Sequence, residues 1–246
     1  MSTSKPVPDI VVGRLPVYLR ALNHLLEEGQ RVTASKELAA RLGISSAQIR
    51  KDLSHFGEFG KQGMGYDVAY LRDQLRSILS VGQAWDVALV GAGDLGHAIA
   101  HYGGFEGRGF RIACVFDNNP QKIGRYLGRF EICDAAQLGD KIRELGIQVG
   151  IIAVPAQAAQ SVVADLAGAG VRAILTYAPI TVTVPEGVHV QYIDPVVHLQ
   201  RMTYYMSPDQ GRGRSSGDGC GQILDYEHTS PVTDGEGRAS RPASSS

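Results

Sequence analysis

The sequence has no run of apolar residues long enough to cross a bilayer. The longest such runs, at 85–93 and 149–154, fall well short of the roughly 20 residues that a membrane-spanning helix needs. The N-terminus also lacks the basic-then-apolar pattern of a secretory signal. We therefore expect a cytoplasmic protein with no membrane partner.

Cysteine is scarce, and its spacing gives no sign of a disulfide framework or a zinc site. The three cysteines are Cys114, Cys133 and Cys220, with no CxxC pair and no Cys/His spacing that suits a metal. Cys114 lies within an apolar stretch, so we expect a small buried hydrophobic residue there rather than a redox thiol. We expect no metal ion.

A large excess of charge of either sign is also missing. The 246 residues carry a net charge of −1, and 43% are hydrophobic and 20% charged, as in ordinary globular proteins. Residues 1–80 contain eleven Lys or Arg and eight Asp or Glu, which gives +3 and leaves −4 for the remainder. This mild asymmetry permits nucleic-acid binding by the first part of the chain without demonstrating it.

The chain divides into four regions, and it contains no internal repeat. Residues 1–80 have mainly helical patterns after a short arm with two prolines at 1–12. Residues 81–193 alternate strand and helix patterns, which predicts an α/β fold with a doubly wound parallel sheet of the Rossmann type. A further short helix is expected at 194–206. Residues 207–246 are rich in Gly, Ser, Pro, Arg and Asp, and we expect this tail to be disordered because it cannot bury enough apolar surface.

The first region has the pattern of a winged helix-turn-helix domain. A second helix is expected at 36–42 with Ser35 as its N-cap, and a third helix is expected to start at Ser45. Ser45 and Gln48 match a capping box, which is a local helix-start signal. The glycines and aromatics of 56–67 predict a β-hairpin, the wing. The support helix that precedes them is indicated by leucines at helical spacing: Leu15, Leu19, Leu22, Leu25 and Leu26.

The third helix is the candidate DNA-reading element. In a helix-turn-helix, the N-terminal residues of this helix face base edges in the major groove. An ordinary solvated helix surface gives the same pattern of polar residues. Arg14 could reach a minor groove, and Lys61 could contact a phosphate at the tip of the wing. The polar residues expected on the reading face are Ser45, Ser46, Gln48, Arg50 and Lys51.

A glycine-rich turn follows the first expected strand of the second region. The strand at 85–90 leads directly into GAGDLG and then into an apolar helix from 98 to 102 and beyond. The first glycine permits a tight turn, the second lets the backbone approach a pyrophosphate, and the third allows close helix packing. Unpaired N–H groups at the start of the helix favour phosphate. The cofactor-binding candidates here are Gly91, Ala92, Gly93, Asp94, Leu95 and Gly96.

Asp117 ends the next expected strand, at 111–116, and lies 21 residues beyond Gly96. An acidic residue at that place accepts hydrogen bonds from the adenosine ribose and repels a 2′-phosphate, which favours NAD(H) over NADP(H). Two alternatives stay open. Asp117 could merely start the turn at 117–120, or the domain could hold coenzyme A.

A nicotinamide-dependent dehydrogenase is the alternative from another functional class. Against it, no substrate domain is recognisable after the Rossmann-like region, since the sequence becomes low-complexity beyond residue 206. Four histidines also have no acid/base partner at readable spacing. They are His97, His101, His189 and His198. A binding protein is therefore favoured over an enzyme.

Four blocks of the sequence resemble the Rex repressors of bacteria. They are SSAQIRKDLSHFGEFGKQGMGYDV (45–68), VALVGAGDLGHAI (87–99), HYGGFEGRGF (101–110) and AVPAQAAQ (153–160). The likeness is collinear over about 15–206, and the first block is the most specific because helix, lysine position and wing match together. The resemblance implies a homodimer that binds a palindromic DNA operator as a repressor when NADH is scarce and releases it when NADH binds.

The resemblance also implies roles for single residues. Arg50 and Lys51 match the recognition-helix pair, with Lys51 the better candidate for a base contact, and Arg14 matches a minor-groove arginine. Tyr102 is expected both to border the cofactor and to belong to a trio that couples the nucleotide state to the DNA-binding domain. The trio is Arg20, Tyr102 and Asp194.

The helix at 194–206 is implied by the resemblance to swap onto the partner subunit. Asp194 can cap that helix, and Pro195 suits its first turn. Pro195 stands where the family usually has a larger apolar residue close to the nicotinamide, and Thr176 replaces the usual asparagine. These departures leave the preference between NADH and NAD⁺ open, while dinucleotide binding is still expected.

Overall fold

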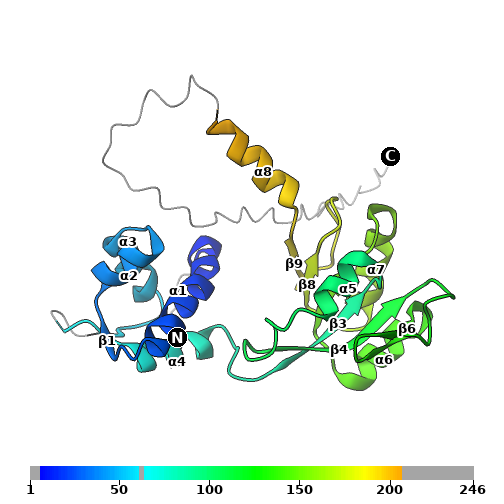
Figure 1. The fold of residues 1–246 in the computed structure, drawn as a ribbon, viewed down its shortest axis with the longest axis horizontal. Coiled ribbons are helices and arrows are strands. Elements are labelled where there is room, and N and C mark those ends of the chain that lie inside the picture. The colour runs from blue at the N-terminus through cyan, green and yellow to red at the C-terminus, as the bar shows by residue number, and fades with distance from the viewer. Residues whose placement is uncertain (1–5, 61–63, 207–246) are drawn as a thin grey trace, which may run out of the picture.

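The computed structural model describes residues 6–60 and 64–206, which form a helical group, a sheet with flanking helices, and a projecting C-terminal helix (Figure 1). The tail predicted to be disordered, at 207–246, lies outside the described residues, as do residues 1–5 and Lys61. The expectations for those segments stay predictions.

The helical group encloses a core of its own. Leu15 and Leu22 of the first helix pack with Ile49 of the third and Leu71 of the fourth, and all four side chains are buried. The predicted support helix and the two helices around a glycine turn are confirmed. The elements in chain order are α1 (Asp9–Glu27), β1 (Val32–Thr33), α2 (Ser35–Leu42), α3 (Ser46–Ser54), β2 (Tyr66–Asp67) and α4 (Val68–Ile78).

Two helix starts differ from the prediction. Helix α1 begins at Asp9, so the expected arm at 1–12 was wrong for its last four residues. Pro8 is the N-cap in an extended conformation, and the Asp9 carboxylate suits the positive end of the helix. Helix α2 begins at Ser35 with Ala34 as its N-cap, so the predicted capping role of Ser35 was wrong. The Ser35 hydroxyl instead accepts a hydrogen bond from Arg50 at 2.9 Å.

The wing is anchored differently from the hairpin predicted within 56–67. In the described part of this segment, only β2 forms a strand, and it pairs antiparallel with β1, Thr33 facing Tyr66. Gly65 has a φ of +77° and lies so close to the Thr33 carbonyl that a side chain would not fit. The base of the wing is therefore paired with β1, which precedes α2. The sequence analysis considered only a hairpin within 56–67 and did not predict this pairing.

The second group is a seven-stranded sheet in the order β5-β6-β4-β3-β7-β8-β9. Neighbouring strands are parallel except for β5 and β6. This confirms the predicted α/β fold class with a doubly wound sheet. The elements are β3 (Trp85–Val90), α5 (Asp94–Ala100), β4 (Phe110–Asp117), β5 (Tyr126–Leu127), β6 (Phe130–Asp134), η1 (Ala135–Gln137), α6 (Leu138–Leu145), β7 (Val149–Ile152), α7 (Ala156–Gly168), β8 (Ala173–Thr176) and β9 (His189–Tyr192).

The strand order places a topological switch point at β3. Strand β4, the next in sequence, lies on one side of β3, whereas β7 lies on the other. In open parallel sheets, ligands bind beyond the carboxyl ends of the strands at such a point. The turn that follows Val90 is therefore at the place where the fold itself offers a binding site.

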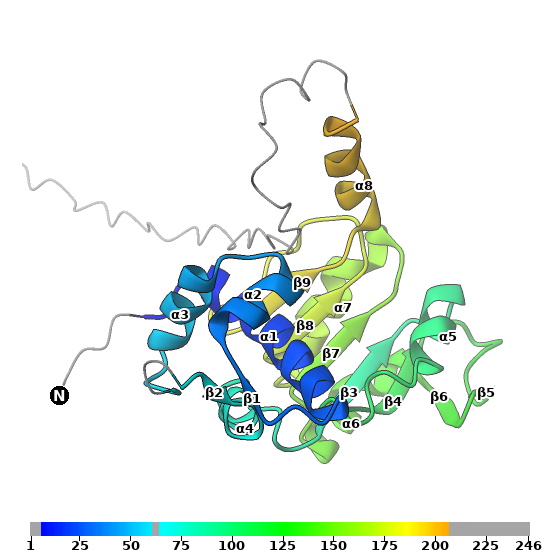
Figure 2. The ribbon, with the colours of Figure 1, turned by 60° about the vertical axis from the view of Figure 1, so that its left-hand side comes forward.

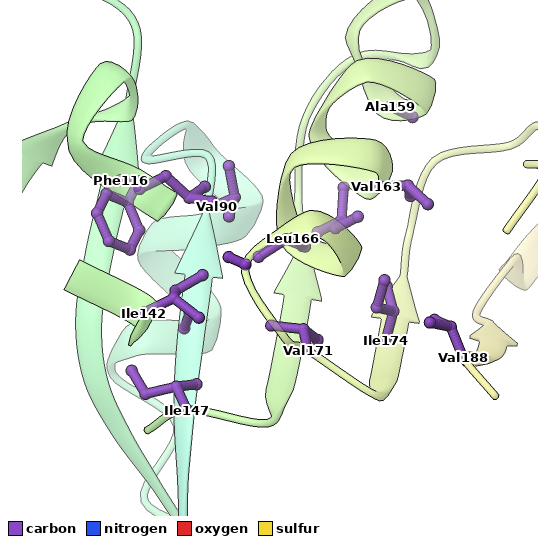
Figure 3. Close-up of a cluster of buried hydrophobic side chains, with 14 of the residues drawn as sticks. Val90, Phe116, Ile142, Ile147, Ala159, Val163, Leu166, Val171, Ile174 and Val188 are labelled. Atoms are coloured by element: carbon purple, nitrogen blue, oxygen red, sulfur yellow. The ribbon is translucent and has the colours of Figure 1, made fainter. Parts of the chain in front are cut away.

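Apolar side chains fill both faces of the sheet. Figure 3 shows one cluster, in which Val90 and Phe116 of the sheet meet Ile142 of α6 and Leu166 of α7. Cys114 belongs to this cluster, and burial raises the pKa of its thiol to about 12. The prediction that Cys114 is a small buried residue is confirmed. The opposite face is covered by a second cluster that contains Val87, Leu89, Ile99, Val115 and Ile151.

The last helix, α8 (Pro195–Tyr204), extends away from the sheet in both views (Figures 1 and 2). The Asp194 carboxylate accepts a hydrogen bond from Val196 N at 2.9 Å, and Pro195 is in the first turn, so the predicted start of this helix is confirmed. No residue of α8 is buried. Its large exposed apolar residues are Val196, Val197, Leu199, Met202 and Tyr204.

Candidate functional site

The glycine-rich turn lies at the carboxyl end of β3, between the ends of β4 and β7. Gly91 N donates to Phe116 O at 2.8 Å, and Ala153 N donates to Val90 O at 2.8 Å. Gly91 has a φ of +103°, and a Cβ there would clash with the Ala153 carbonyl. The turn is thus fixed between neighbouring strands in a conformation that glycine adopts readily and other residues do not.

The other two glycines of the turn differ in their surroundings. A Cβ on Gly96 would clash with the carbonyl oxygen of Gly91, so α5 packs directly on the turn. A Cβ on Gly93 would meet no atom within 4 Å. Gly96 therefore suits close packing, and Gly93 suits the close approach of a ligand. The open cavity beside Gly93 has a volume of about 420 Å³ and is lined by Ala92, Gly93, Asp94, His97 and Lys122.

The helix that follows starts and ends earlier than predicted. Helix α5 runs from Asp94 to Ala100, whereas the sequence indicated a helix from 98 to 102 and beyond. Its early start brings Asp94 and Leu95 into the first turn of the helix, and Leu95 is 42% exposed. Gly103 and Gly104 follow its end, which explains the stop because glycine destabilises a helix.

Asp117 ends β4 beside the turn and is only 8% exposed. Its Oδ2 accepts a hydrogen bond from Ala92 N at 2.8 Å, and its Oδ1 accepts one from Asn119 N at 2.8 Å. Burial raises the pKa of Asp117, but the N–H groups of Asn119 and Ala92 and the Lys122 ammonium outweigh this effect and hold the pKa below its usual range. Asp117 is therefore an ionised, buried carboxylate beside the turn, and its partner Lys122 lines the cavity. Asp117 also starts a turn, so the two interpretations left open by the sequence do not exclude each other.

Lys122 is a residue of this site that the sequence analysis missed. Its Nζ lies 3.1 Å from Asp117 Oδ2, and its side chain lines the same cavity. The turn after β4 brings it there, since Lys122 N donates to Asn119 O at 2.9 Å. A lysine in the loop after the acidic residue indicates a site residue only when the conformation of that loop is known.

Tyr102 lies away from the glycine-rich turn in this single chain. It is 55% exposed and borders a separate cavity of about 270 Å³, together with Phe105 and Phe130. Arg20 is exposed on α1, and Asp194 caps α8. In the described part of the chain, no hydrogen bond or ion pair joins these three residues to one another. The coupling trio therefore stays a prediction.

Helix α3 begins with half of the predicted capping box. The Ser45 side chain accepts a hydrogen bond from Gln48 N at 3.1 Å, as expected of an N-cap. The reciprocal half was wrong, because Gln48 Nε2 donates to Asp52 Oδ1 at 2.6 Å instead of reaching back to Ser45. In the capping box the side-chain oxygen of Gln48 would accept from the Ser45 N–H, whereas here the side chain donates to a buried carboxylate in a stronger, charge-assisted hydrogen bond.

The exposed face of α3 carries Arg50 and Lys51. Arg50 reaches Ser35 of α2, and the Lys51 ammonium makes no hydrogen bond or ion pair within the described residues. Ser45 is exposed beside them, and Ser46 is half-buried. Lysine and arginine that project from the exposed face of such a helix are suited to contacts with phosphates and base edges.

Arg14 makes an ion pair within the helical group. Its Nε and Nη2 donate to the two carboxylate oxygens of Asp52 at 2.6 and 2.8 Å, and its side chain is 15% exposed. Tyr18 donates to the same carboxylate at 2.6 Å. The minor-groove contact expected of Arg14 stays a prediction. The arginine connects α1 to α3 through a bidentate ion pair.

The carboxylate at the centre of this network stays ionised. Burial raises the pKa of Asp52, but the hydrogen bonds from Arg14, Tyr18 and Gln48 outweigh it and lower the pKa below its usual range. The hydrogen bond to Asp52 also raises the pKa of Arg14. One buried negative charge is thus matched by one arginine and two neutral donors, which leaves the position of α3 relative to α1 well defined.

Thr176 and Pro195 are the two departures from the resembling family. Thr176 is fully buried at the end of β8, and its hydroxyl accepts a hydrogen bond from Ala178 N at 3.2 Å. Pro195 occupies the first turn of α8. Both residues thus have local structural roles, and the preference between NADH and NAD⁺ stays open.

Two further properties concern the described residues as a whole. Within 6–60 and 64–206, no three His, Cys, Asp or Glu side chains gather in a group that could hold a metal ion. No helix in those ranges is both long enough and apolar enough to span a membrane.

Comparison with known proteins adds independent findings. The family described as "Putative DNA-binding protein N-terminus" matches residues 6–54, and the family "CoA binding domain" matches residues 82–180. The redox-sensing transcriptional repressor Rex of Roseiflexus sp. strain RS-1 is 50% identical over 214 residues, which are 87% of this chain and 97% of the relative.

Solved structures of a Rex-family repressor named RSP are similar to most of this chain. RSP in complex with β-NAD⁺ and operator DNA matches with a TM-score of 0.79 and 35% identity, covering 84% of this chain and 95% of RSP. RSP in complex with β-NADH matches with a TM-score of 0.75 and 33% identity, covering 84% of this chain and 97% of RSP.

Proposed function

Because this chain belongs to the Rex family of redox-sensing transcriptional repressors, we propose which of its parts carry out that function. It is a DNA-binding repressor that responds to the NADH/NAD balance, and it is not an enzyme. We assign operator binding to residues 1–80, nucleotide binding to 81–193 and dimer formation to the helix at 194–206. The cytoplasm, where a bacterial chromosome lies, is the compartment that this function requires.

The observation that carries the nucleotide assignment is the contact between Asp117 and the glycine-rich turn. The carboxylate accepts from Ala92 N at 2.8 Å at the switch point of the sheet. Gly93 leaves room for a pyrophosphate, and Asp117 is an acceptor for the hydroxyls of the adenosine ribose. These features support NAD(H) as the ligand, as does the binding of NAD⁺ and NADH by RSP. Coenzyme A is the competing ligand that the name of the second matching family suggests.

The oxidised and reduced cofactors differ in the charge of one ring. The nicotinamide of NAD⁺ is a cation, whereas the dihydronicotinamide of NADH is neutral. Surroundings that are apolar disfavour the cation through the cost of desolvation. A pocket closed by apolar residues therefore binds the reduced form more tightly, and NADH becomes the ligand that drives the change of state.

The exposed apolar residues of α8 supply that apolar surface in the dimer. Val196, Leu199 and Met202 are each more than half exposed on a helix in which no residue is buried. A helix of this kind is stabilised by packing on a partner. We assign it to the second copy of the chain, in a homodimer whose two α3 helices face successive half-sites of a palindromic operator, about 34 Å apart.

The function is tested by measuring operator binding against nucleotide. The full chain selects its operator from a randomised pool of duplexes, and affinity is then measured with NADH, NAD⁺ or coenzyme A. We expect NADH to weaken operator binding by about tenfold or more, since coupling energies of this kind are about 1–3 kcal/mol. By linkage, operator DNA must weaken NADH binding by the same factor. Operator affinity that is indifferent to NADH, or that responds to coenzyme A alone, contradicts the assignment.

Replacing Lys51 by methionine should lower operator affinity about tenfold and reduce the discrimination between operator and unrelated duplex. Lys51 is exposed on α3 and has no partner among the described residues, so its ammonium is free for a base edge. The matched control is Lys36→Met, the same change at an exposed residue of α2. Electrophoretic mobility shifts with both duplexes measure the effect. A Lys51→Met chain that discriminates as well as the wild type would refute the base contact.

A further inference from the structure

The ribose end of the proposed nucleotide site contains a cation as well as an anion. Asp117 Oδ2 accepts from Ala92 N at 2.8 Å and from Lys122 Nζ at 3.1 Å. The other oxygen, Oδ1, accepts from Asn119 N at 2.8 Å. The carboxylate is almost fully buried, whereas the side chain of Lys122 is 36% exposed. The part of the ion pair that faces the cavity is therefore largely the ammonium group.

The chain fixes the position from which Lys122 reaches the cavity. Lys122 N donates to Asn119 O at 2.9 Å, and Arg125 N donates to Lys122 O at 3.0 Å. The backbone is thus held on both sides of the lysine in the turn that follows β4. The side chain borders the same space as Gly93 and His97.

An acidic residue alone at the end of β4 would exclude a phosphorylated ribose by charge repulsion, and a cation near that position is what accommodates such a phosphate. Here the acidic residue, Asp117, and a cation, the Lys122 ammonium, are both present and form an ion pair. We propose that Lys122 is a specificity-determining residue, which sets how strictly the site rejects an adenosine ribose that carries a phosphate. This proposal rests on nucleotide binding at the site proposed above.

The ion pair also predicts how the two kinds of ribose compete. A free ribose hydroxyl donates to Asp117 and replaces the ammonium as a donor, so Lys122 is not needed to hold it. A ribose phosphate places negative charge beside Asp117, and the ammonium then offsets the repulsion. Loss of the ammonium therefore weakens binding of the phosphorylated form more than binding of the unphosphorylated form.

The test compares NADH and NADPH in the full-length wild type, Lys122→Met and Lys122→Arg by titration calorimetry. For Lys122→Met we expect the ratio of NADPH to NADH dissociation constants to rise about fivefold, which is the size of a partly exposed charge interaction. Lys122→Arg keeps the charge and should keep the ratio near that of the wild type. Coenzyme A, whose ribose carries a 3′-phosphate, is added as a competitor. It shows whether Lys122 distinguishes a 3′-phosphate from the 2′-phosphate of NADPH.

The matched control is Arg111→Met. Arg111 pairs with Asp86 at 2.7 Å at the amino ends of β4 and β3, on the opposite edge of the sheet, so the same charge is removed far from the turn. An unchanged ratio in Lys122→Met, or an equal rise in Arg111→Met, overturns the role of Lys122 and leaves the proposed function intact. A wild type that binds neither dinucleotide contradicts the proposed function and the role of Lys122 with it.

Discussion

Replacing Asp52 by asparagine lowers the free energy of unfolding by about 3 kcal/mol, the scale for breaking a buried ion pair on one side. Asp52 is fully buried, and its two oxygens accept four hydrogen bonds from Arg14, Tyr18 and Gln48. Asparagine has the same shape but turns one acceptor into a donor, which then faces other donors. It also leaves the arginine without a counter-ion. Chemical denaturation monitored by circular dichroism measures the loss.

Operator affinity falls together with stability in this variant, because the same contacts hold α3 against α1. The matched control is Asp73→Asn, which removes a carboxylate from an exposed pair with Arg72 in the same group of helices. Tyr18→Phe removes one donor to Asp52 and should cost about 1 kcal/mol. If Asp52→Asn unfolds at the same denaturant concentration as Asp73→Asn, the network does not hold the helices together.

The same carboxylate gives stability a definite dependence on pH. Asp52 ionises more readily in the folded chain than in the unfolded chain, because its hydrogen bonds outweigh its burial and lower its pKa. Its contribution is therefore complete above the ordinary carboxyl range near 4 and is lost as the pH falls below that range. Asp117 has a lowered pKa for similar reasons and acts in the same sense. Asp52→Asn should thus reduce the acid sensitivity without abolishing it.

The structure of the proposed nucleotide site was predictable because its signals are local. Strand, glycine-rich turn and helix follow one another within 85–100, and the close contact that requires Gly96 lies inside that segment. Asp117 follows from the next strand in the chain. Lys122 was not predictable, because its place depends on the turn after β4 and not on any periodicity of sequence. The cavity it lines is formed only when that turn folds back toward Gly93.

The DNA-binding group was predictable in its helices but not in its polar core. Arg14 was assigned to DNA from its place near the N-terminal arm and from the family resemblance, and neither signal predicts a partner inside the fold. Its partner Asp52 lies 38 residues away in the sequence, so no local pattern reveals the pair. The pairing of β1 with β2 was not predicted for a similar reason. Strands of two residues carry no alternation, and their register is set by the close approach of Gly65 to Thr33.

Replacing Gly93 by alanine is expected to weaken NADH binding about 100-fold while the chain keeps its fold, since close backbone approach to the pyrophosphate is what this glycine permits. Gly93 has a φ of −80°, which alanine adopts without strain, and a Cβ there meets no protein atom within 4 Å. The added methyl group instead projects into the space that the ligand needs.

The contrast with Gly96→Ala makes this prediction specific. A Cβ on Gly96 clashes with the Gly91 carbonyl, so that variant must shift the turn and lose stability as well as NADH binding. Gly93→Ala should keep wild-type thermal stability and wild-type operator affinity, and its operator binding should no longer respond to NADH. A Gly93→Ala protein that still releases DNA at the wild-type NADH concentration would place the effector away from this turn. The substitution leaves α3 and its contacts unchanged. We therefore expect Gly93→Ala to stay bound to its operator at every NADH concentration, which would show that the DNA response depends on the cavity beside Gly93.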